Sequence, residues 1–196
     1  YTSVDGTTAA SWTTKTVAGN HQKLASALQN DGSTTFKPHA VVATRPSSNI
    51  VSVSTDEALT TWTTKTLSLS AGTIQSVAHG YIGAGTNKFV VISNDTRDIE
   101  YSTDAGASWT SLVDALPANN FSCITYGKGL YVALRTGADI GAISTDGETY
   151  TAVTLPNSKN WIDVVWGNGI FVALASNTGA NNMAYSIDGT NWVAVS

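Results

Sequence analysis

The sequence has little charge, one cysteine and no long apolar run. Charged residues make up 12% of the 196 residues, and the ten lysines and arginines are scattered rather than clustered. Nothing here would neutralise a row of phosphates, so we expect no nucleic-acid partner. No stretch approaches the roughly 18 consecutive apolar residues of a membrane helix, so we expect no membrane insertion. The lone Cys123 excludes an internal disulfide, and its apolar neighbours are typical of a buried side chain.

Patterns that bind metals or catalyse reactions are equally scarce. The three histidines contain no pair at metal-ligand spacing, and no Gly-x-Ser-x-Gly nucleophile elbow is present. Acidic residues gather between Asp95 and Glu100, but their spacing fits no calcium loop and is typical of a solvated loop. The sequence therefore predicts no metal site, no cofactor and no catalytic residue.

What the sequence does contain is an internal repeat built on Ser-x-Asp. The repeated aspartates stand at 5, 56, 104, 146 and 188, which makes them 51, 48, 42 and 42 residues apart. A period of this size holds four short strands, the content of one propeller blade. The repeated positions are Ser3, Asp5 and Trp12; Ser54, Asp56 and Trp62; Ser102, Asp104, Gly106 and Trp109; Ser144, Asp146, Gly147 and Tyr150; and Ser186, Asp188, Gly189 and Trp192.

The last two repeats align over most of their length. Residues 161–174 match residues 121–134 almost position for position, and each segment reads as strand, two-residue Gly turn, strand. A third strand such as 183–186 precedes the Ser-x-Asp turn, and a fourth such as 192–195 follows it. We name these strands A, B, C and D. No stretch shows sustained helical periodicity, so we expect an all-β protein.

The pattern Ser-x-Asp-(x)-Gly-x-x-Trp between strands C and D resembles the Asp-box, or BNR repeat, of sialidase-type β-propellers. The tract from Trp166 to Ala173 resembles repeats of bacteriophage tail and tail-fibre proteins. Together these resemblances cover essentially the whole chain. They imply a β-propeller of four-stranded antiparallel blades with Asp-box C–D hairpins. They imply less about function, since similar Asp-boxes occur in non-enzymatic lectins, sorting receptors and photosystem assembly factors.

The repeat predicts one domain over residues 1–196. We expect a half-blade at 1–17 and full blades at about 18–66, 67–113, 114–155 and 156–196. The N-terminal half-blade has a C–D hairpin without strands A and B, so the sequence does not determine how the propeller ring closes. The missing strands precede Tyr1 in a longer protein, or a neighbouring chain supplies them, or a four-bladed ring carries a spare hairpin.

We expect the repeated Ser and Asp residues to fold their own turns rather than to catalyse. Oxygens of Ser102 and Asp104 are placed to accept from backbone N–H groups of their loop, and Gly106 to take a positive φ. Trp109 would cover the turn. Five such turns at equal radius on successive blades lie too far apart to form one catalytic set.

The propeller resemblance places the B–C and D–A loops on the face opposite the Asp-boxes, which is the usual ligand face. The chain's three arginines, Arg45, Arg97 and Arg135, all fall in these B–C loops. Sialidases hold a substrate carboxylate with an arginine triad, which suits the planar guanidinium. The glutamates that would complete such an enzyme are on other parts of the predicted blades. The alternative is that these arginines pair with nearby aspartates in solvated loops.

A glycan site on this face would combine an aromatic platform with charged and amide donors. Trp161 begins a strand A directly after a polar D–A loop, so it is the candidate platform. The alternative is that Trp161 only fills space between blades, as Phe121 would one repeat earlier. The full candidate set is Arg45, Arg97, Arg135, Trp161, Asn177, Asn181 and Asn182.

The sequence therefore predicts a non-catalytic binding or structural module, not an enzyme. We expect it to be extracellular or virion-associated, on a phage tail or similar assembly, where it contacts a glycan, a cell-surface receptor or other proteins of the assembly. One alternative is a fragment of an Asp-box glycoside hydrolase. Another is a purely structural assembly domain that binds no small ligand.

Overall fold

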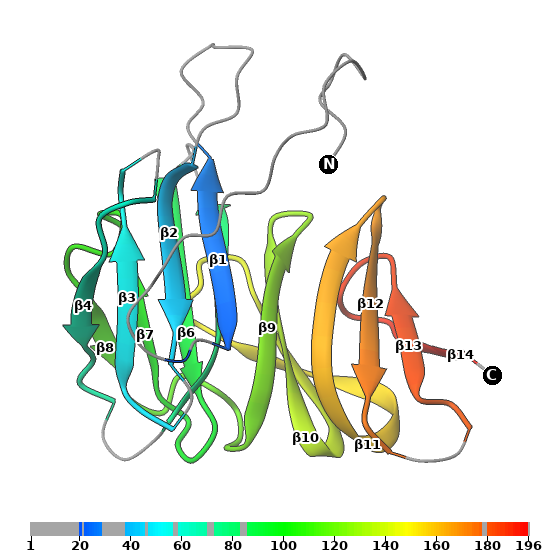
Figure 1. The fold of residues 1–196 in the computed structure, drawn as a ribbon. Helices are drawn as coiled ribbons and strands as arrows, with labels where there is room; N and C mark the ends of the chain where they lie inside the picture. Colours follow the sequence, from blue (N-terminus) through cyan, green and yellow to red (C-terminus); the bar gives the residue numbers. More distant parts are fainter. Residues whose placement is uncertain are drawn as a thin grey trace.

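The structure is a computed structural model that describes residue 20 and residues 22–28, 38–45, 47–56, 59–69, 73–82, 86–177 and 180–195. Regular elements in these ranges are β-strands (Figure 1). The predicted half-blade 1–17, with Ser3, Asp5 and Trp12, lies outside the described residues. No helix among the described residues is long and apolar enough to cross a membrane.

Two sheets in the first half of the chain each contain four antiparallel strands in chain order. The first sheet comprises β1 (Lys23–Leu28), β2 (Pro38–Thr44), β3 (Ile50–Ser54) and β4 (Thr63–Thr66). The second sheet comprises β5 (Ile74–Ile82), β6 (Thr86–Ser93), β7 (Ile99–Ser102) and β8 (Thr110–Leu112). Runs rich in Val, Ile and Thr form these strands, as the repeat predicts. The expected all-β class with four-stranded antiparallel sheets is thus confirmed.

The last part of the chain forms one six-stranded sheet, where the sequence predicts two separate units. Its strands are β9 (Phe121–Gly127), β10 (Leu130–Ser144), β11 (Thr151–Gly167), β12 (Ile170–Ala175), β13 (Met183–Ser186) and β14 (Val193–Val195). The long strands β10 and β11 join these units into one sheet. β10 pairs with β9 over its first half and with β11 over its second half, and β11 continues from β10 to β12.

The join has a visible backbone cause. Thr136 pairs with Asn160, and Ala138 pairs with Lys159, with register shifts around them and a positive φ of 73° at Gly137. Pairing therefore does not stop where one repeat ends. We call β9, β10 and residues 151–155 of β11 the middle unit. We call residues 161–167 of β11 with β12, β13 and β14 the C-terminal sheet.

The core lies between successive sheets, in three buried clusters. Strand β6 shows how one strand serves two of them: Val91 packs with Val42 of the first sheet, whereas Val90 and Ile92 pack with Tyr131 of the middle unit. All five side chains are fully buried. A third cluster joins the middle unit to the C-terminal sheet. An interior sheet is therefore apolar on both faces, which explains its continuous hydrophobic runs.

The connections separate into two ends of the molecule. In Figure 1 strands β3, β9 and β13 end toward the top, and strands β2, β6 and β12 end toward the bottom. We call the lower end the loop face. Backbone bonds tie its connections together: Leu67 N donates to Asn49 O (2.7 Å) and Asn120 N donates to Asn94 O (2.5 Å).

The Ser-x-Asp turns are held by their own side chains. Ser102 Oγ donates to Asp104 Oδ1 (2.8 Å) and accepts from Gly106 N (2.8 Å). Asp104 Oδ1 accepts from Ser108 N (2.9 Å), and Trp109 Nε1 donates to Gly106 O (3.1 Å). These bonds satisfy polar groups of the turn locally.

The other described turns repeat this pattern with one departure. Asp146 and Asp188 each accept two backbone bonds of 2.8 Å from their own loops. Trp192 Nε1 donates to Gly189 O (2.9 Å). At the looser copy, Asp56 accepts from Thr60 N (3.0 Å), as Asp104 does from Ser108 N, and also from Thr61 N one residue further on, because extra residues lengthen this loop.

Candidate functional site

A hollow of about 510 Å³ lies on the loop face between the β6–β7 and β8–β9 connections. Charged and amide residues of both connections line it, among them Asp95, Arg97, Asp114 and Asn119. Val113 adds an apolar side chain that is 73% exposed. The hollow thus offers donors, acceptors and apolar surface together, which is the combination that ligand sites use.

Two bonds fix the shape of this hollow. Arg97 Nη2 pairs with Asp114 Oδ1 at 2.5 Å, and Asp114 N donates to Asp98 Oδ1 at 3.0 Å. Leu116 N also donates to Arg97 O (2.9 Å), so the two connections are tied through backbone as well. The Arg97–Asp114 pair is largely solvent-exposed and adds little to stability. Its charged groups stay accessible to a ligand.

The three arginines do not all meet. Arg135 Nε donates to the carbonyl of Asn119 (2.9 Å), and Asn119 lines the hollow with Arg97, so these two arginines lie around one residue. Arg45 instead donates from Nη2 to Ser52 Oγ (3.2 Å) in the first sheet. The structure therefore groups Arg97 and Arg135, and it leaves Arg45 in a different environment.

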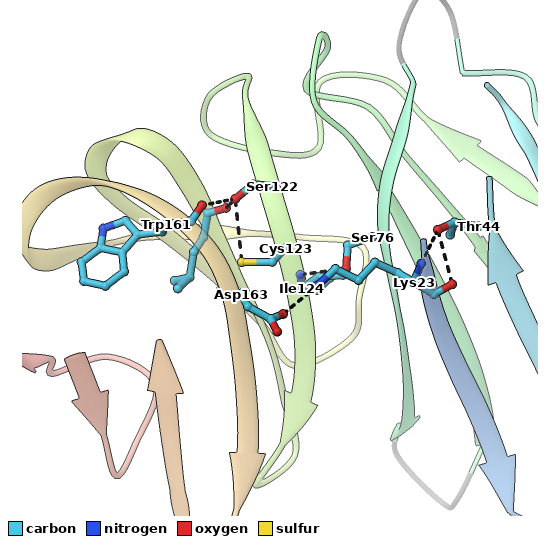
Figure 2. A network of polar contacts seen from close by, with 9 residues as sticks. Lys23, Thr44, Ser76, Ser122, Cys123, Ile124, Trp161 and Asp163 are labelled. Carbon is cyan, nitrogen blue, oxygen red and sulfur yellow. Dashed lines mark hydrogen bonds and ion pairs between the residues drawn. The ribbon is translucent and has the colours of Figure 1, made fainter. Parts of the chain in front are cut away.

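Trp161 is a core residue. Its side chain is 0% exposed and lies in the cluster between the middle unit and the C-terminal sheet. Its carbonyl accepts a hydrogen bond from Ser122 Oγ (2.5 Å), as Figure 2 shows. Phe121, at the same position one repeat earlier, is also 0% exposed. Burial thus rules out Trp161 as a surface platform in this conformation and favours the space-filling alternative.

The three candidate asparagines shape the β12–β13 connection. Asn177 Oδ1 accepts from Asn160 N, and Asn182 Nδ2 donates to Asn177 O, both at 2.5 Å. Asn181 has a φ of 60°, a left-handed conformation that asparagine tolerates better than most residues. All three lie on the loop face, but Asn177 bonds to Asn160 of β11, and Asn182 bonds to Asn177 and to Lys159 Nζ of β11 (3.4 Å).

A second hollow, of about 360 Å³, lies among the inner strands β1, β5, β9 and β11. Lys23 Nζ of β1 reaches across it to Asp163 Oδ1 of β11 at 2.9 Å (Figure 2). Between these two strands, Ile124 N donates to Ser76 Oγ (3.3 Å). The sequence interpretation missed this pair. The signal that was available is one charged residue in each of two otherwise apolar strands A.

The described glutamates do not form a hydrolytic pair. Glu100 is 1% exposed between the first and second sheets, and this burial raises its pKa despite backbone bonds from Ser68 and Leu69. Glu148 pairs with Lys88 Nζ, and Glu57 lies outside the described residues. Within the described ranges, no group of three His, Cys, Asp or Glu side chains could hold a metal ion.

Solved structures that share this fold are β-propeller proteins. A catalytically inactive variant of virginiamycin B lyase from Staphylococcus aureus, with quinupristin, gives a TM-score of 0.65 at 14% identity, over 92% of this chain and 57% of that one. YCF48 from Cyanidioschyzon merolae gives 0.57 at 14% identity, over 88% and 54%. A GH74 enzyme from Niastella koreensis gives 0.56 at 21% identity, over 88% and 24%.

These likenesses establish an all-β, propeller-like fold. The chain spans little more than half the length of the lyase and YCF48. No protein-family model matches the sequence, and no curated protein matches it either. The similar structures include enzymes and a YCF48 bound to a D1 peptide, so the fold alone does not fix an activity.

Proposed function

We propose that the protein is a non-catalytic binding module that contacts a glycan or cell-surface receptor through the loop face. The observation that carries this proposal is the hollow around Asn119. It combines an accessible ion pair between Arg97 and Asp114, the neighbouring Arg135 and the exposed Val113. Sugars present apolar C–H faces beside hydroxyl groups, so a site for them needs apolar and hydrogen-bonding groups side by side.

The proposal includes the surroundings of the hollow. A ligand longer than the hollow would extend along the loop face toward Asn177, Asn181 and Asn182. The Ser-x-Asp turns then serve as Asp-boxes with a structural role at the opposite end. The low charge of the chain and its scarcity of catalytic groups fit a rigid module of a phage tail or another extracellular assembly.

A protein partner is consistent with one structural neighbour, because YCF48 is found bound to a D1 peptide. The GH74 neighbour is the observation that favours the alternative, a fragment of a glycoside hydrolase. Glycoside hydrolysis generally needs two carboxyl groups flanking the bond. Neither Glu100 nor Glu148 lines the loop-face hollow, and its carboxyl groups are Asp95, Asp98 and Asp114. Asp114 pairs with Arg97, Asp98 accepts from Asp114 N, and Asp95 accepts from Thr73 N (3.5 Å), so all three are engaged within the protein, which supports the binding module over the hydrolase.

The test compares Arg97→Ala and Arg135→Ala with Lys128→Ala in glycan-array and host-cell binding. Lys128 is an exposed cation whose Nζ contacts Ile187 O at the Ser-x-Asp end, so it is a matched control. We expect each arginine variant to bind about tenfold or more weakly, since a charged hydrogen bond contributes about 1.5–3 kcal/mol. Lys128→Ala should bind like the parent, and melting temperatures should change little in all three.

If both arginine variants bind like the parent, the hollow is not the contact site. If the parent binds neither glycans nor cells, the purely structural alternative is favoured. Product release from aryl glycosides that disappears in Glu100→Gln would support the hydrolase alternative.

A further inference from the structure

Successive sheets lock together through a glycine and a valine. A Cβ atom built on Gly106 would stand 2.9 Å from Val53 Cγ1, and one built on Gly147 would stand 2.9 Å from Val90 Cγ2. At Gly189 the corresponding distance to Val132 Cγ2 is 3.2 Å. Each of these glycines belongs to a Ser-x-Asp turn. The turn of each sheet therefore seats on the preceding sheet so closely that a larger residue would have to displace it.

One receiving valine recurs at the same position of the repeat: Val90 and Val132 are the nearest contacts of their glycines, and Val42 Cγ2 lies 3.5 Å from the Cβ on Gly106, beside its cross-strand partner Val53. Val42, Val90 and Val132 occupy the second strand of consecutive units, and all three are 0% exposed. The register identifies the fourth member: Phe171 lies opposite Ser186 and Val172 opposite Tyr185, just as Phe89 lies opposite Ser102. Val172 is only half-buried. No turn from the described part of the chain follows the C-terminal sheet to seat on it.

The sheet face that contains Val172 is apolar across three neighbouring strands. Leu174 lies opposite Met183, Met183 opposite Val195, and Tyr185 opposite Val193, so these side chains point the same way. We call this the open face and define it as Val172, Leu174, Met183, Tyr185, Val193 and Val195. Exposure reaches 45% at Leu174, 42% at Met183 and 50% at Val193.

The second sheet shows what covers such a face. By register, Ile92 corresponds to Leu174, and Ile99 corresponds to Met183. Ile92 and Ile99 are both 0% exposed, because the middle unit packs on them with Tyr131 and its neighbours. The same repeat positions are thus buried in the second sheet and exposed to solvent in the C-terminal sheet. An apolar patch of this kind marks an interaction site, and its complement is another sheet of the same repeat.

The sequence carries two further Ser-x-Asp copies, at Ser54–Asp56 and at Ser3–Asp5, the second of which lies outside the described residues. Both belong to the N-terminal end, opposite in chain order to the open face. This chain spans 57% of the virginiamycin B lyase chain, so two copies have enough length for one such propeller. The N-terminal part of another molecule of the same protein is therefore of the right kind to pack on the open face.

We propose that a second copy of this chain covers the open face, seating its first sheet (β1–β4) head to tail on Val172 and Leu174. Within each copy, consecutive sheets already pack in this way. Two copies that cover each other's open faces form a closed dimer, whereas a rotation that does not close produces longer assemblies. In either case the driving force is removal of the open face from water.

The test is the mass of the full 196-residue chain by sedimentation and light scattering over a wide concentration range. We expect the parent to associate reversibly, and Leu174→Lys and Met183→Lys to raise the dissociation constant at least about tenfold, because a charge cannot be buried there unpaired. Val113→Lys, an equally drastic change at an exposed apolar residue of the loop face, should associate like the parent. Thermal melting checks that each variant is folded.

Cysteine trapping separates head-to-tail packing from two open faces meeting each other. Leu174→Cys should form no disulfide-linked dimer under mild oxidation, because head-to-tail packing keeps the two copies of residue 174 apart. Cys123 does not interfere, since it is 1% exposed. The proposal is overturned by a monomeric parent at every concentration, by association that survives both lysine variants, or by efficient trapping of Leu174→Cys.

Discussion

The aspartates of the Ser-x-Asp turns are ionised acceptors rather than reactive groups. Hydrogen bonds from the backbone of Asn191, from its side chain and from the backbone of Thr190 lower the pKa of Asp188. For Asp146, burial alone would raise the pKa, but bonds from Thr149, Glu148 and Ser144 lower it. A carboxylate held by several N–H donors is a poor proton acceptor. The residue chemistry at this end therefore agrees with a folding role.

Glu100 is the opposite case, and its burial predicts a pH dependence. Desolvation raises its pKa above the ordinary value in the folded state. The folded state therefore binds the proton more tightly, and its contribution to stability is full below the unfolded pKa and is lost as pH rises through the folded pKa. Glu100→Gln removes this loss, because the neutral amide needs no deprotonation.

We therefore expect the stability of Glu100→Gln relative to the parent to increase as pH rises above about 4.3, the ordinary pKa of glutamate. Urea unfolding at a series of pH values between acid and neutral checks this. The matched control is Glu148→Gln, whose parent carboxylate is 39% exposed and pairs with Lys88. A constant difference between Glu100→Gln and the parent over the whole pH series would contradict the burial argument.

The strand pattern of single repeats is readable from the sequence. The aligned hairpin 121–134 is present as β9 and the start of β10, and the expected third strand 183–186 coincides with β13. The fusion of two repeats into one sheet is not readable, because it depends on pairing of Thr136 with Asn160 across the join. Local propensity carries no information about that register.

The Gly–Val contact between sheets gives an element-scale prediction. Gly147 and Gly129 have similar φ values, 72° and 78°, but a Cβ on Gly147 would clash with Val90, whereas one on Gly129 meets nothing within 4 Å. We expect Gly129→Ala to lower the unfolding free energy by about 1–2 kcal/mol, the cost of a left-handed alanine. Gly147→Ala should cost about 1–3 kcal/mol more, the range for overpacking.

Chemical unfolding of the two variants checks this directly. Because the backbone conformation is matched, the difference between them reports the packing of the turn against Val90 and Lys88 of the second sheet and against Tyr131 of its own unit. Equal losses of stability in Gly129→Ala and Gly147→Ala would show that the turn does not lock against the preceding sheet.

At the scale of the whole molecule, Arg45 and Arg97 lie in the β2–β3 and β6–β7 connections, as the sequence predicts, whereas Arg135 lies within the long strand β10 rather than in a loop. The sequence does not show which of the three meet. Arg97 lines the hollow together with Asn119, and Arg135 of β10 donates to the carbonyl of Asn119. The Lys23–Asp163 contact joins residues 140 positions apart, and no repeat pattern encodes it. For Trp161 the sequence leaves a surface platform and a space-filling residue both open, and the packing of adjacent units decides for burial.

We propose that the loop face binds the ligand and that the Ser-x-Asp end has a structural role only. Hydrogen–deuterium exchange, with and without the glycan that binds best on the array, tests it most directly. We expect protection on binding in residues 94–98 and 113–120, around the hollow, and unchanged exchange in the turn at 186–192. Protection concentrated at 186–192, with none at 94–98 or 113–120, would contradict it.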